Sequence, residues 1–507
     1  MLRGYELSAL SGCHCPQLLS LRSVPVFIKK EAITMTPSHL LLRRSVLSGA
    51  ALVAFSLSAG VSAATLAVGP GQSFSTPCQA FAVAASGDTV EIDAAGSYYG
   101  DVCGIQQDNL TIRGVNGRPK IDAGGQNALG KGTWVLMGSG TTIENVEMFG
   151  AAVPDQNGAA IRLDGGDLTL RGSYLHHNEN GILTVSNGTA NVVIENSEFS
   201  DNGRGDGHTH NLYIGNINSL VFRGSYSHDA NVGHNLKSRA RTNTIVYSRF
   251  SSTYGQPSYE IDLPNAGTSY VIGNVIQQPA ANQAATMLAY GEEGASNPGQ
   301  DLYVVNNTFL NDDSVRGTFV MVGDGVGTPA LLQNNIFSGT GNATNQVSAI
   351  DRNNFRSLSP SFINRAAFDL HPTADSPMVN AGAAVGAAAS GMSLAPSEQY
   401  TFPVGTEPRP SDGAIDIGAY EASAAVAAPS TVLTSLTSAA VDAASSTTSW
   451  TECANEGGVC SFTGTRQVRY GANGSYAYKT ATDSIGCDNA TFGDPAYGVV
   501  KACAYAQ

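Results

Sequence analysis

The sequence is poor in charged residues, and after its first 63 residues it has no long apolar run. Only 13 % of the 507 residues are charged. Short runs of Asn, Ser, Thr and Val, together with 57 glycines, are typical of turn-rich β structure rather than of helical bundles. The chain is too long for one compact core, so we expect several domains or a repeat architecture.

Basic residues are scarce as well. Of the 27 Lys and Arg and 41 Asp and Glu, six and two lie in residues 1–63, so the rest holds 21 and 39, a net charge of −18. A nucleic-acid partner is excluded on this ground, because no basic face is available to release counterions. An acidic ligand would need a local basic patch to overcome the overall negative field.

The N-terminal segment predicts export. Met35 offers a second start, followed by Arg43 and Arg44, an apolar run over 45–59, and the small residues Val61-Ser-Ala63. We interpret residues 35–63 as a signal peptide, with twin-arginine character, and residues 1–34 as upstream sequence. A genuine N-terminal extension is the alternative. Since no other stretch is apolar enough to cross a membrane, we expect a secreted protein, extracellular or periplasmic.

Six cysteines follow the signal peptide, and an even number in an exported chain indicates disulfides. Two lie near the start of this region and four near the end. We predict the pair Cys78–Cys103 and two bridges in the tail. Three tail pairings are possible, and we favour Cys453–Cys460 with Cys487–Cys503.

A strand-turn unit recurs through the middle of the chain, with copies such as Ile143-Glu-Asn-Val-Glu-Met148 and Ile194-Glu-Asn-Ser-Glu-Phe199. Its fourth position falls at residues 146, 173, 197, 225, 248, 274, 307 and 335. A drifting period mostly in the twenties predicts a coiled β solenoid, whose stacked coils bury a shared core. Asparagines occupy the third position in four copies, and we expect them to form a ladder of turn amides: Asn145, Asn196, Asn306 and Asn334.

The ends of this region carry further signals. Residues 77–85 predict a short amphipathic cap helix, followed by Gly87–Ile92 as the first strand. With the phrases at 368–371, 376–382 and 416–420, the opening resembles secreted right-handed parallel β-helix proteins of the pectate-lyase-like superfamily. The resemblance covers about residues 65–422 and implies an all-β, right-handed parallel β-helix over 64–422 with an N-terminal helical cap.

The C-terminal region predicts two further parts. Residues 423–448 are rich in Ala, Ser and Thr and predict a linker. Residues 449–507 resemble the small cysteine-stapled β modules appended to secreted carbohydrate-active enzymes, and the resemblance implies sugar binding through Trp450, Arg469 and Tyr470. A structural cap or a dimer contact is the equal alternative, although we expect a monomer.

Polar side chains concentrate between residues 206 and 262, and six of the nine histidines lie in or just before this run. Aligning 210–213, 234–237 and 259–262 as successive coils places Leu212, Leu236 and Ile261 inward. The alternation then predicts two outer columns that wall a groove for a linear polymer: Asn211, Asn235 and Glu260; and Tyr213, Lys237 and Asp262, with Arg239 on the same face. His210 and His234 have inward parity, so they lie either at a bend or in the core.

The run Gly233–Ala240 resembles the catalytic coil of β-helix lyases that cleave uronate polymers of the alginate and chondroitin type. The resemblance implies Lys237 as the base for β-elimination on an acidic polysaccharide. It also implies calcium, with Asn211 and Glu260 as candidate ligands. We expect a lowered pKa for Lys237 because Arg239 is close. The full prediction is catalysis by Lys237, Arg239, His234, His210 and Tyr259, and substrate binding by Tyr213, Arg241, Asn235 and Asp262.

Three other functions fit parts of the pattern. A C5-epimerase would remove the same proton. A non-catalytic polysaccharide-binding or surface protein needs no chemistry. A glycoside hydrolase needs paired carboxylates, and the adjacent pair Asp312-Asp313 falls outside the polar run. The coil at 259–265 has no Arg, which departs from the lyase pattern. The C5-epimerase and the polysaccharide-binding or surface protein therefore remain open.

Overall fold

The computed structural model describes residues 63–411, 413–422, 450–472, 475–492 and 500–506. The upstream segment, the linker and, apart from Ala63, the signal peptide lie outside these residues. Within them, no helix is long and apolar enough to cross a membrane. The main body is a right-handed parallel β-helix, as the sequence predicted.

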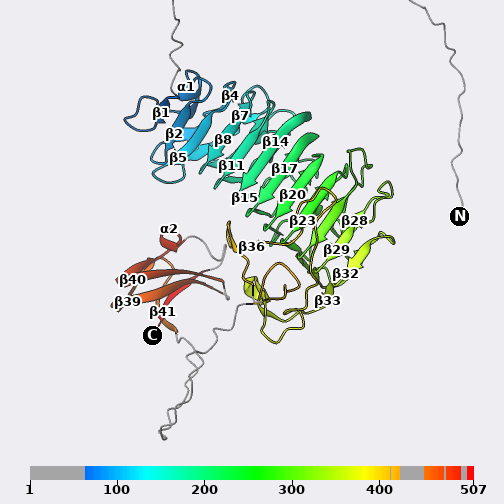
Figure 1. Cartoon of the computed structure of the whole chain (residues 1–507). Coiled ribbons are helices and arrows are strands. Elements are labelled where there is room, and N and C mark those ends of the chain that lie inside the picture. Colours follow the sequence, from blue (N-terminus) through cyan, green and yellow to red (C-terminus); the bar gives the residue numbers. More distant parts are fainter. Residues whose placement is uncertain (1–62, 412, 423–449, 473–474, 493–499, 507) are drawn as a thin grey trace, which may run out of the picture. The chain divides into compact units, whose positions relative to one another are not determined.

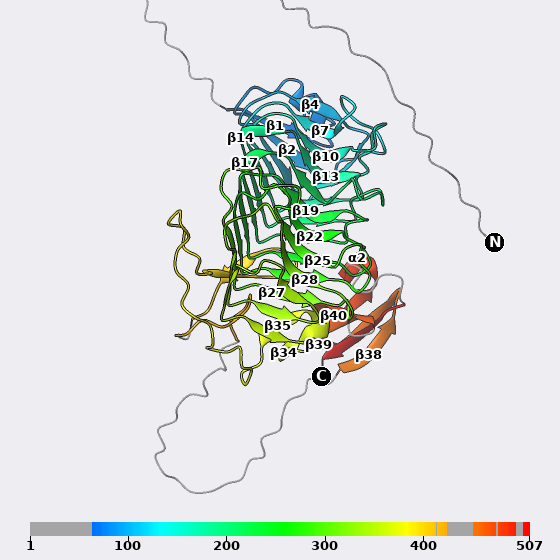
Figure 2. The same ribbon diagram turned by 90° about the vertical axis from the view of Figure 1, so that its right-hand side faces the viewer.

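Three parallel sheets form the walls of the β-helix, and each coil contributes one strand to each sheet (Figures 1 and 2). Sheet A contains β1 (Thr65–Val68), β2 (Thr89–Asp93), β5 (Thr111–Val115), β8 (Thr141–Glu144), β11 (Leu168–Arg171), β14 (Asn187–Glu195), β17 (Ile217–Arg223), β20 (Thr242–Val246), β23 (Thr268–Ile272), β26 (Leu302–Val305), β29 (Leu331–Gln333) and β32 (Ile350–Arg352). Sheet B contains β3 (Tyr98–Tyr99), β6 (Lys120–Asp122), β9 (Glu147–Phe149), β12 (Tyr174–His176), β15 (Glu198–Ser200), β18 (Tyr226–His228), β21 (Arg249–Ser251), β24 (Val275–Gln278), β27 (Thr308–Asn311), β30 (Ile336–Ser338) and β33 (Phe355–Ser357).

Sheet C carries the polar run. It contains β4 (Cys103–Ile105), β7 (Gly132–Leu136), β10 (Ala159–Leu163), β13 (Asn180–Thr184), β16 (Leu212–Ile214), β19 (His234–Ser238), β22 (Tyr259–Leu263), β25 (Thr286–Tyr290), β28 (Thr318–Val322) and β31 (Asn342–Thr344). Figure 2 shows most of these strands one below another on one face. Inward residues such as Leu212, Leu236 and Ile261 are fully buried in one continuous core. Burying each aliphatic side chain stabilises the fold by about 1.5–3 kcal/mol.

The repeat read from the sequence sets a ladder of hydrogen bonds at the turn between sheets A and B. At each fourth position, a backbone N–H donates to the side-chain oxygen of the equivalent residue in the next coil, at 2.7–3.2 Å. The ladder runs through Val146, Ser173, Ser197, Ser225, Ser248, Asn274, Asn307, Asn335 and Asn354. Each coil therefore fixes the register of the next.

The asparagines one position earlier have a different role from the one predicted. Asn145, Asn196, Asn306 and Asn334 all have φ between 49° and 57°, the left-handed conformation that asparagine tolerates and the tight turn requires. Among the bonds of the described residues, only Asn334 donates to another of the four, to Asn306 at 3.3 Å. The continuous ladder thus lies one residue later than expected.

The two ends differ in detail from the prediction. The cap helix α1 spans Pro77–Phe81, shorter than expected, and Phe81 packs edge-on against Trp134 at 5.4 Å inside the first coils. A strand, β1, precedes the one that the sequence placed first, because Thr65–Val68 pairs with Thr89–Ile92. The predicted bridge Cys78–Cys103 is present.

Beyond β33 the chain stops coiling and packs against the flank of the β-helix. This tail contains β34 (Phe362–Asn364), a 3-10 helix (Arg365–Ala367), β35 (Asp369–Pro372), β36 (Glu398–Tyr400) and β37 (Thr406–Pro408). Its apolar residues Leu370 and Tyr400 cover Val275 and Leu310 of sheet B. Arg223 of sheet A donates to Glu398 at 2.5 Å. The coils therefore end near residue 357 rather than near 422.

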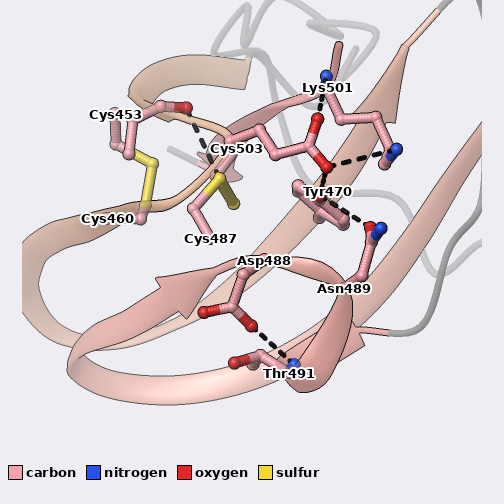
Figure 3. The surroundings of a disulfide bond; sticks show 11 residues. Cys453, Cys460, Tyr470, Cys487, Asp488, Asn489, Thr491, Lys501 and Cys503 are labelled. Atoms are coloured by element: carbon pink, nitrogen blue, oxygen red, sulfur yellow. Dashed lines mark hydrogen bonds and ion pairs between the residues drawn. A yellow bond between two sulfur atoms is a disulfide. The ribbon is translucent and has the colours of Figure 1, made fainter. Parts of the chain in front are cut away.

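The C-terminal module is an antiparallel sheet of four strands. It contains β38 (Trp450–Asn455), β39 (Gly458–Ala472), β40 (Ser475–Cys487) and β41 (Ala502–Ala506), in the order β38-β41-β39-β40, with the short helix α2 (Asn489–Phe492). Both favoured disulfides are present, Cys453–Cys460 and Cys487–Cys503 (Figure 3). The core of so small a module would not be stable enough without these two disulfides.

Candidate active site

The predicted register of the polar coils is confirmed. Tyr213 pairs with Lys237, and Lys237 pairs with Asp262, on β16, β19 and β22. Because Leu236 points into the core, Lys237 lies on the outer face of sheet C, with Asp262 on the next coil. One of the two predicted outer columns is therefore present.

Ion pairs tie this column together. Lys237 Nζ donates to Asp262 Oδ2 at 2.6 Å and to Glu293 Oε1 at 2.8 Å. Arg239 Nη2 donates to the other oxygen of Glu293 at 2.5 Å. The side chains of Lys237 and Asp262 are only 9 % and 3 % exposed, whereas that of Glu293 is 48 % exposed. A lysine and an arginine thus converge on one carboxylate above a buried aspartate.

Arg239 is held from two further sides. Its Nε donates to the Tyr213 hydroxyl at 2.9 Å, and its Nη1 donates to Asn265 Oδ1 at 2.5 Å. Together with the bond to Glu293, these contacts use three donor positions of the Arg239 guanidinium, and they fix the plane of that group near the end of β16. Tyr213 consequently lies beside the cation with its hydroxyl near the site.

The two histidines lie on the same side as Lys237, as the bend alternative predicted, because the alternation fails at the start of β19. The rings of His210 and His234 stack at 4.8 Å, and the ring of Tyr259 stacks on His234 at 5.1 Å. The backbone N–H of Tyr259 donates to His234 Nδ1 at 3.2 Å, so Nε2 carries the proton and faces Asp262 at 3.2 Å. His234 therefore orients Asp262 in this tautomer.

The protonation states differ from the prediction for the lysine. Burial lowers the pKa of Lys237, but the carboxylates of Asp262 and Glu293 outweigh it and raise that pKa above its ordinary value. Burial raises the pKa of Asp262, but the opposing effect of His234 and Lys237 is larger, so the pKa of Asp262 is lowered overall. Burial and the nearby cations hold the pKa of His210 well below its usual range. The expected lowered pKa of Lys237 is wrong: Arg239 is close, but two carboxylates are closer.

The second predicted outer column is also wrong. Asn211, Asn235 and Glu260 are 0 %, 0 % and 1 % exposed, and they form an internal ladder at the turn between sheets B and C. Asn211 Nδ2 donates to Asn235 at 3.0 Å, and Asn235 Nδ2 donates to Glu260 Oε2 at 2.5 Å. The same bend that turns His234 outward turns these residues inward.

Calcium does not fit the ligands suggested for it. Glu260 lies at the end of an amide ladder, and burial raises its pKa to about 8, which keeps it neutral. Asn235 separates it from Asn211. Among the described residues, no group of three His, Cys, Asp or Glu side chains is arranged to hold a metal ion. No step of the mechanism is therefore assigned to a metal.

Two differences from the sequence prediction concern residues at the edge of the cluster around Lys237. Arg241 is exposed, and its guanidinium lies over Gly188 of sheet A, away from the cluster. Glu293, in contrast, joins the cluster from the loop after β25 and was not predicted. Its signal was the acidic pair in Gly291-Glu-Glu-Gly294, two coils after Lys237, because loops of a solenoid reach over neighbouring coils.

The C-terminal module places its candidate sugar contacts on different sides. Tyr470 is fully buried, and its hydroxyl bonds to Glu456 and Asn489 at 2.8 Å, so it is part of the core (Figure 3). Arg469 has the opposite parity. Its guanidinium lies between the rings of Trp450 and Tyr476, at 4.8 and 4.3 Å. The candidate face therefore contains Trp450, Arg469 and Tyr476.

Comparisons with known proteins return little. No family model matches the chain, and no curated protein matches it. Among solved structures, it is similar to one titled "Crystal structure of pectate lyase Pel9A", at 16 % identity and a TM-score of 0.49, over 72 % of this chain and 98 % of that one. A likeness at this level adds nothing about chemistry.

Proposed function

We propose that the protein is a secreted lyase that cleaves an acidic, uronate-containing polysaccharide by β-elimination at Lys237. The supporting observation is the convergence of Lys237 and Arg239 on a single carboxylate at the outer face of sheet C. A uronate sugar presents a carboxylate next to the proton that must be removed. The three disulfides agree with an oxidising, extracellular or periplasmic location.

The proposed roles follow from the contacts. Arg239 neutralises the uronate carboxylate, which stabilises the negative charge that develops as C5 loses its proton. The neutral amine of Lys237 takes that proton, the C4–O bond breaks, and a C4–C5 double bond forms. The Tyr213 hydroxyl, bonded to Arg239, gives its proton to the leaving oxygen. His234 holds Asp262, and the rings of Tyr259 and His210 stack on His234.

A non-catalytic polysaccharide-binding protein is the second candidate, and one observation favours it. Lys237 is protonated in the free protein, since two carboxylates raise its pKa. An ammonium group binds anions but removes no proton. The lyase must therefore change this state when its substrate binds, whereas a binding protein need not.

Turnover separates the candidates. The chain is incubated with polygalacturonate, alginate and chondroitin, and the ultraviolet absorbance of unsaturated uronate ends is followed, with and without chelator. We expect a rise that Lys237→Ala reduces by about 10²- to 10⁴-fold. The matched control is Lys131→Ala, because Lys131 also pairs with a carboxylate, Asp164, next to sheet C. Loss of activity in the chelated sample would assign a role to a metal.

A flat trace on all polymers contradicts the lyase. Proton exchange at C5 without unsaturation would then identify a C5-epimerase. Binding without either reaction would identify the polysaccharide-binding protein. Equal loss in Lys237→Ala and Lys131→Ala would show a structural effect instead of a catalytic one.

We further propose that the C-terminal module binds sugar through the face of Trp450, Arg469 and Tyr476. Aromatic rings stack on sugar rings, and the arginine favours acidic ones. In the full chain, Trp450→Ala should reduce retention on immobilised polysaccharide and leave turnover of short soluble oligomers unchanged. Unchanged retention would favour a structural role for the module.

A further inference from the structure

The loop between β25 and β26 places a carboxylate of the chain itself in the candidate active site. Glu293 reaches two coils back and bridges both cations, with 2.8 Å to Lys237 Nζ and 2.5 Å to Arg239 Nη2. A carboxylate that accepts from two cations is the arrangement a bound acid would show. No other contact explains the position of its side chain among the described residues.

The backbone of this loop is anchored independently of the Glu293 side chain. The N–H of Glu293 donates to Pro264 O at 3.0 Å. Asn297 is 6 % exposed and donates to the carbonyl oxygens of Arg239 and Ala240 at 3.2 and 3.0 Å. The side chain of Glu293 can therefore swing away by changing rotamer while the loop keeps its place.

Asp262 and Glu293 hold the same lysine in different ways. Asp262 is 3 % exposed, and His234 also holds it at 3.2 Å. Glu293 is 48 % exposed, so solvent screens its ion pairs far more than the pair of Lys237 with Asp262. One carboxylate is a fixed partner of Lys237, and the other is exchangeable.

We propose that Glu293 occupies the position of a ligand carboxylate, and that the site admits an acidic sugar by exchanging one carboxylate for another. The acidic sugar as ligand rests on the proposed function; the exchange itself rests on the contacts of Glu293. When Glu293 leaves, Arg239 loses a negatively charged partner, and a neutral sugar cannot supply another. Glu293 thereby selects for acidic polymers and closes the site in their absence.

The test measures binding rather than turnover. Calorimetry compares the full chain with Glu293→Gln and Glu292→Gln, using galacturonate and mannuronate tetramers and their methyl esters as probes. Glu292 is the matched control, because it precedes Glu293 and, within the described part of the chain, makes no ion pair with Lys237 or Arg239. We expect Glu293→Gln to bind an acidic tetramer about 3- to 10-fold more tightly. The esters and Glu292→Gln should show no gain, and the unfolding temperature should stay unchanged.

The outcomes distinguish the exchange from the proposed function. Tighter binding of an acidic tetramer by Glu293→Gln alone supports the exchange, even where the wild type binds too weakly to measure or turns nothing over. Equal affinity in wild type and Glu293→Gln overturns the exchange and leaves the lyase intact. A gain shared by the methyl esters or by Glu292→Gln overturns it too, as does a failure of every variant to bind either acid.

Discussion

Two columns of polar side chains follow the same three coils along sheet C, two residues apart in sequence, and they are held in different ways. The inner column, Asn211, Asn235 and Glu260, is neutral, buried and hydrogen-bonded from coil to coil. The outer column around Lys237 and Asp262 is charged and ends in the half-exposed Glu293. Neutral ladders satisfy buried polar groups, whereas charged clusters near solvent can exchange partners.

The position of a residue relative to the bend decides which column it joins. At the start of β19, Asn235 points inward and His234 outward, the reverse of what alternation from the inward Leu236 predicts. Substitutions in the inner column should therefore act on stability, and those in the outer column on ligand binding and turnover. Four measurements test this division.

The largest effect is expected at Glu260, which burial keeps neutral with a pKa of about 8. The unfolded carboxyl has a pKa near 4.5, so the folded state binds a proton that the unfolded state lacks between these values. Stability from this group is full below pH 4.5 and falls as pH rises to about 8. Relative to Glu260→Gln, the wild type should lose about 4 kcal/mol between pH 5 and pH 8.

Unfolding of the wild type and of Glu260→Gln by guanidinium chloride across this pH range measures the difference in their unfolding free energies. Taking the difference cancels other titrating groups, such as His228, whose pKa is raised to about 10 because Tyr226, Asp229 and Glu198 outweigh its burial. Parallel pH curves for the two proteins would mean that Glu260 is ionised in the fold and that the ladder ends differently.

The next effect concerns Asn235 in the middle of the inner column. Asn235→Ala removes the acceptor of Asn211 and the donor to Glu260, both buried, and should cost about 3 kcal/mol of unfolding free energy. Asn218→Ala is the control, because that exposed amide donates to Asn191 at 2.8 Å and to no other described residue. A similar loss in both variants would remove the distinction between ladder and surface amides.

Arg239 tests the outer column. Arg239→Gln should weaken binding of an acidic tetramer by about 10- to 100-fold, since charged hydrogen bonds are worth about 1.5–3 kcal/mol. Its stability should fall by less than that of Asn235→Ala, because Arg239 is only partly buried and Glu293, one of its three partners, is half-exposed. Calorimetry measures the change in affinity, and thermal unfolding of the same sample measures the change in stability. A stability loss without a binding loss would make Arg239 a structural residue.

The sequence was sufficient to predict the coils and their register, which depend on periodicity. The spacing of residues such as Ser197 and Ser225 predicted the coils, and the offset of 24 from Tyr213 to Lys237 predicted their register. The sequence left open whether His234 lies at a bend or in the core, and it did not predict that Asn235 points inward, because a bend of one residue leaves no trace in the period. Glu293 was missed since a loop's reach across coils depends on anchors such as Asn297, which only the fold brings beneath it.

The smallest effect is expected at Arg241, which the sequence assigned to substrate binding. It is exposed and lies over Gly188 of sheet A, and it makes no ion pair with any described residue of the cluster. Arg241→Gln should change unfolding free energy by less than about 0.5 kcal/mol and leave affinity for acidic tetramers within about twofold. Calorimetry beside Arg239→Gln makes the comparison direct, because the two arginines are two residues apart. A loss as large as that of Arg239→Gln would mean that the ligand crosses from sheet C onto sheet A, and that the binding surface extends beyond the outer column.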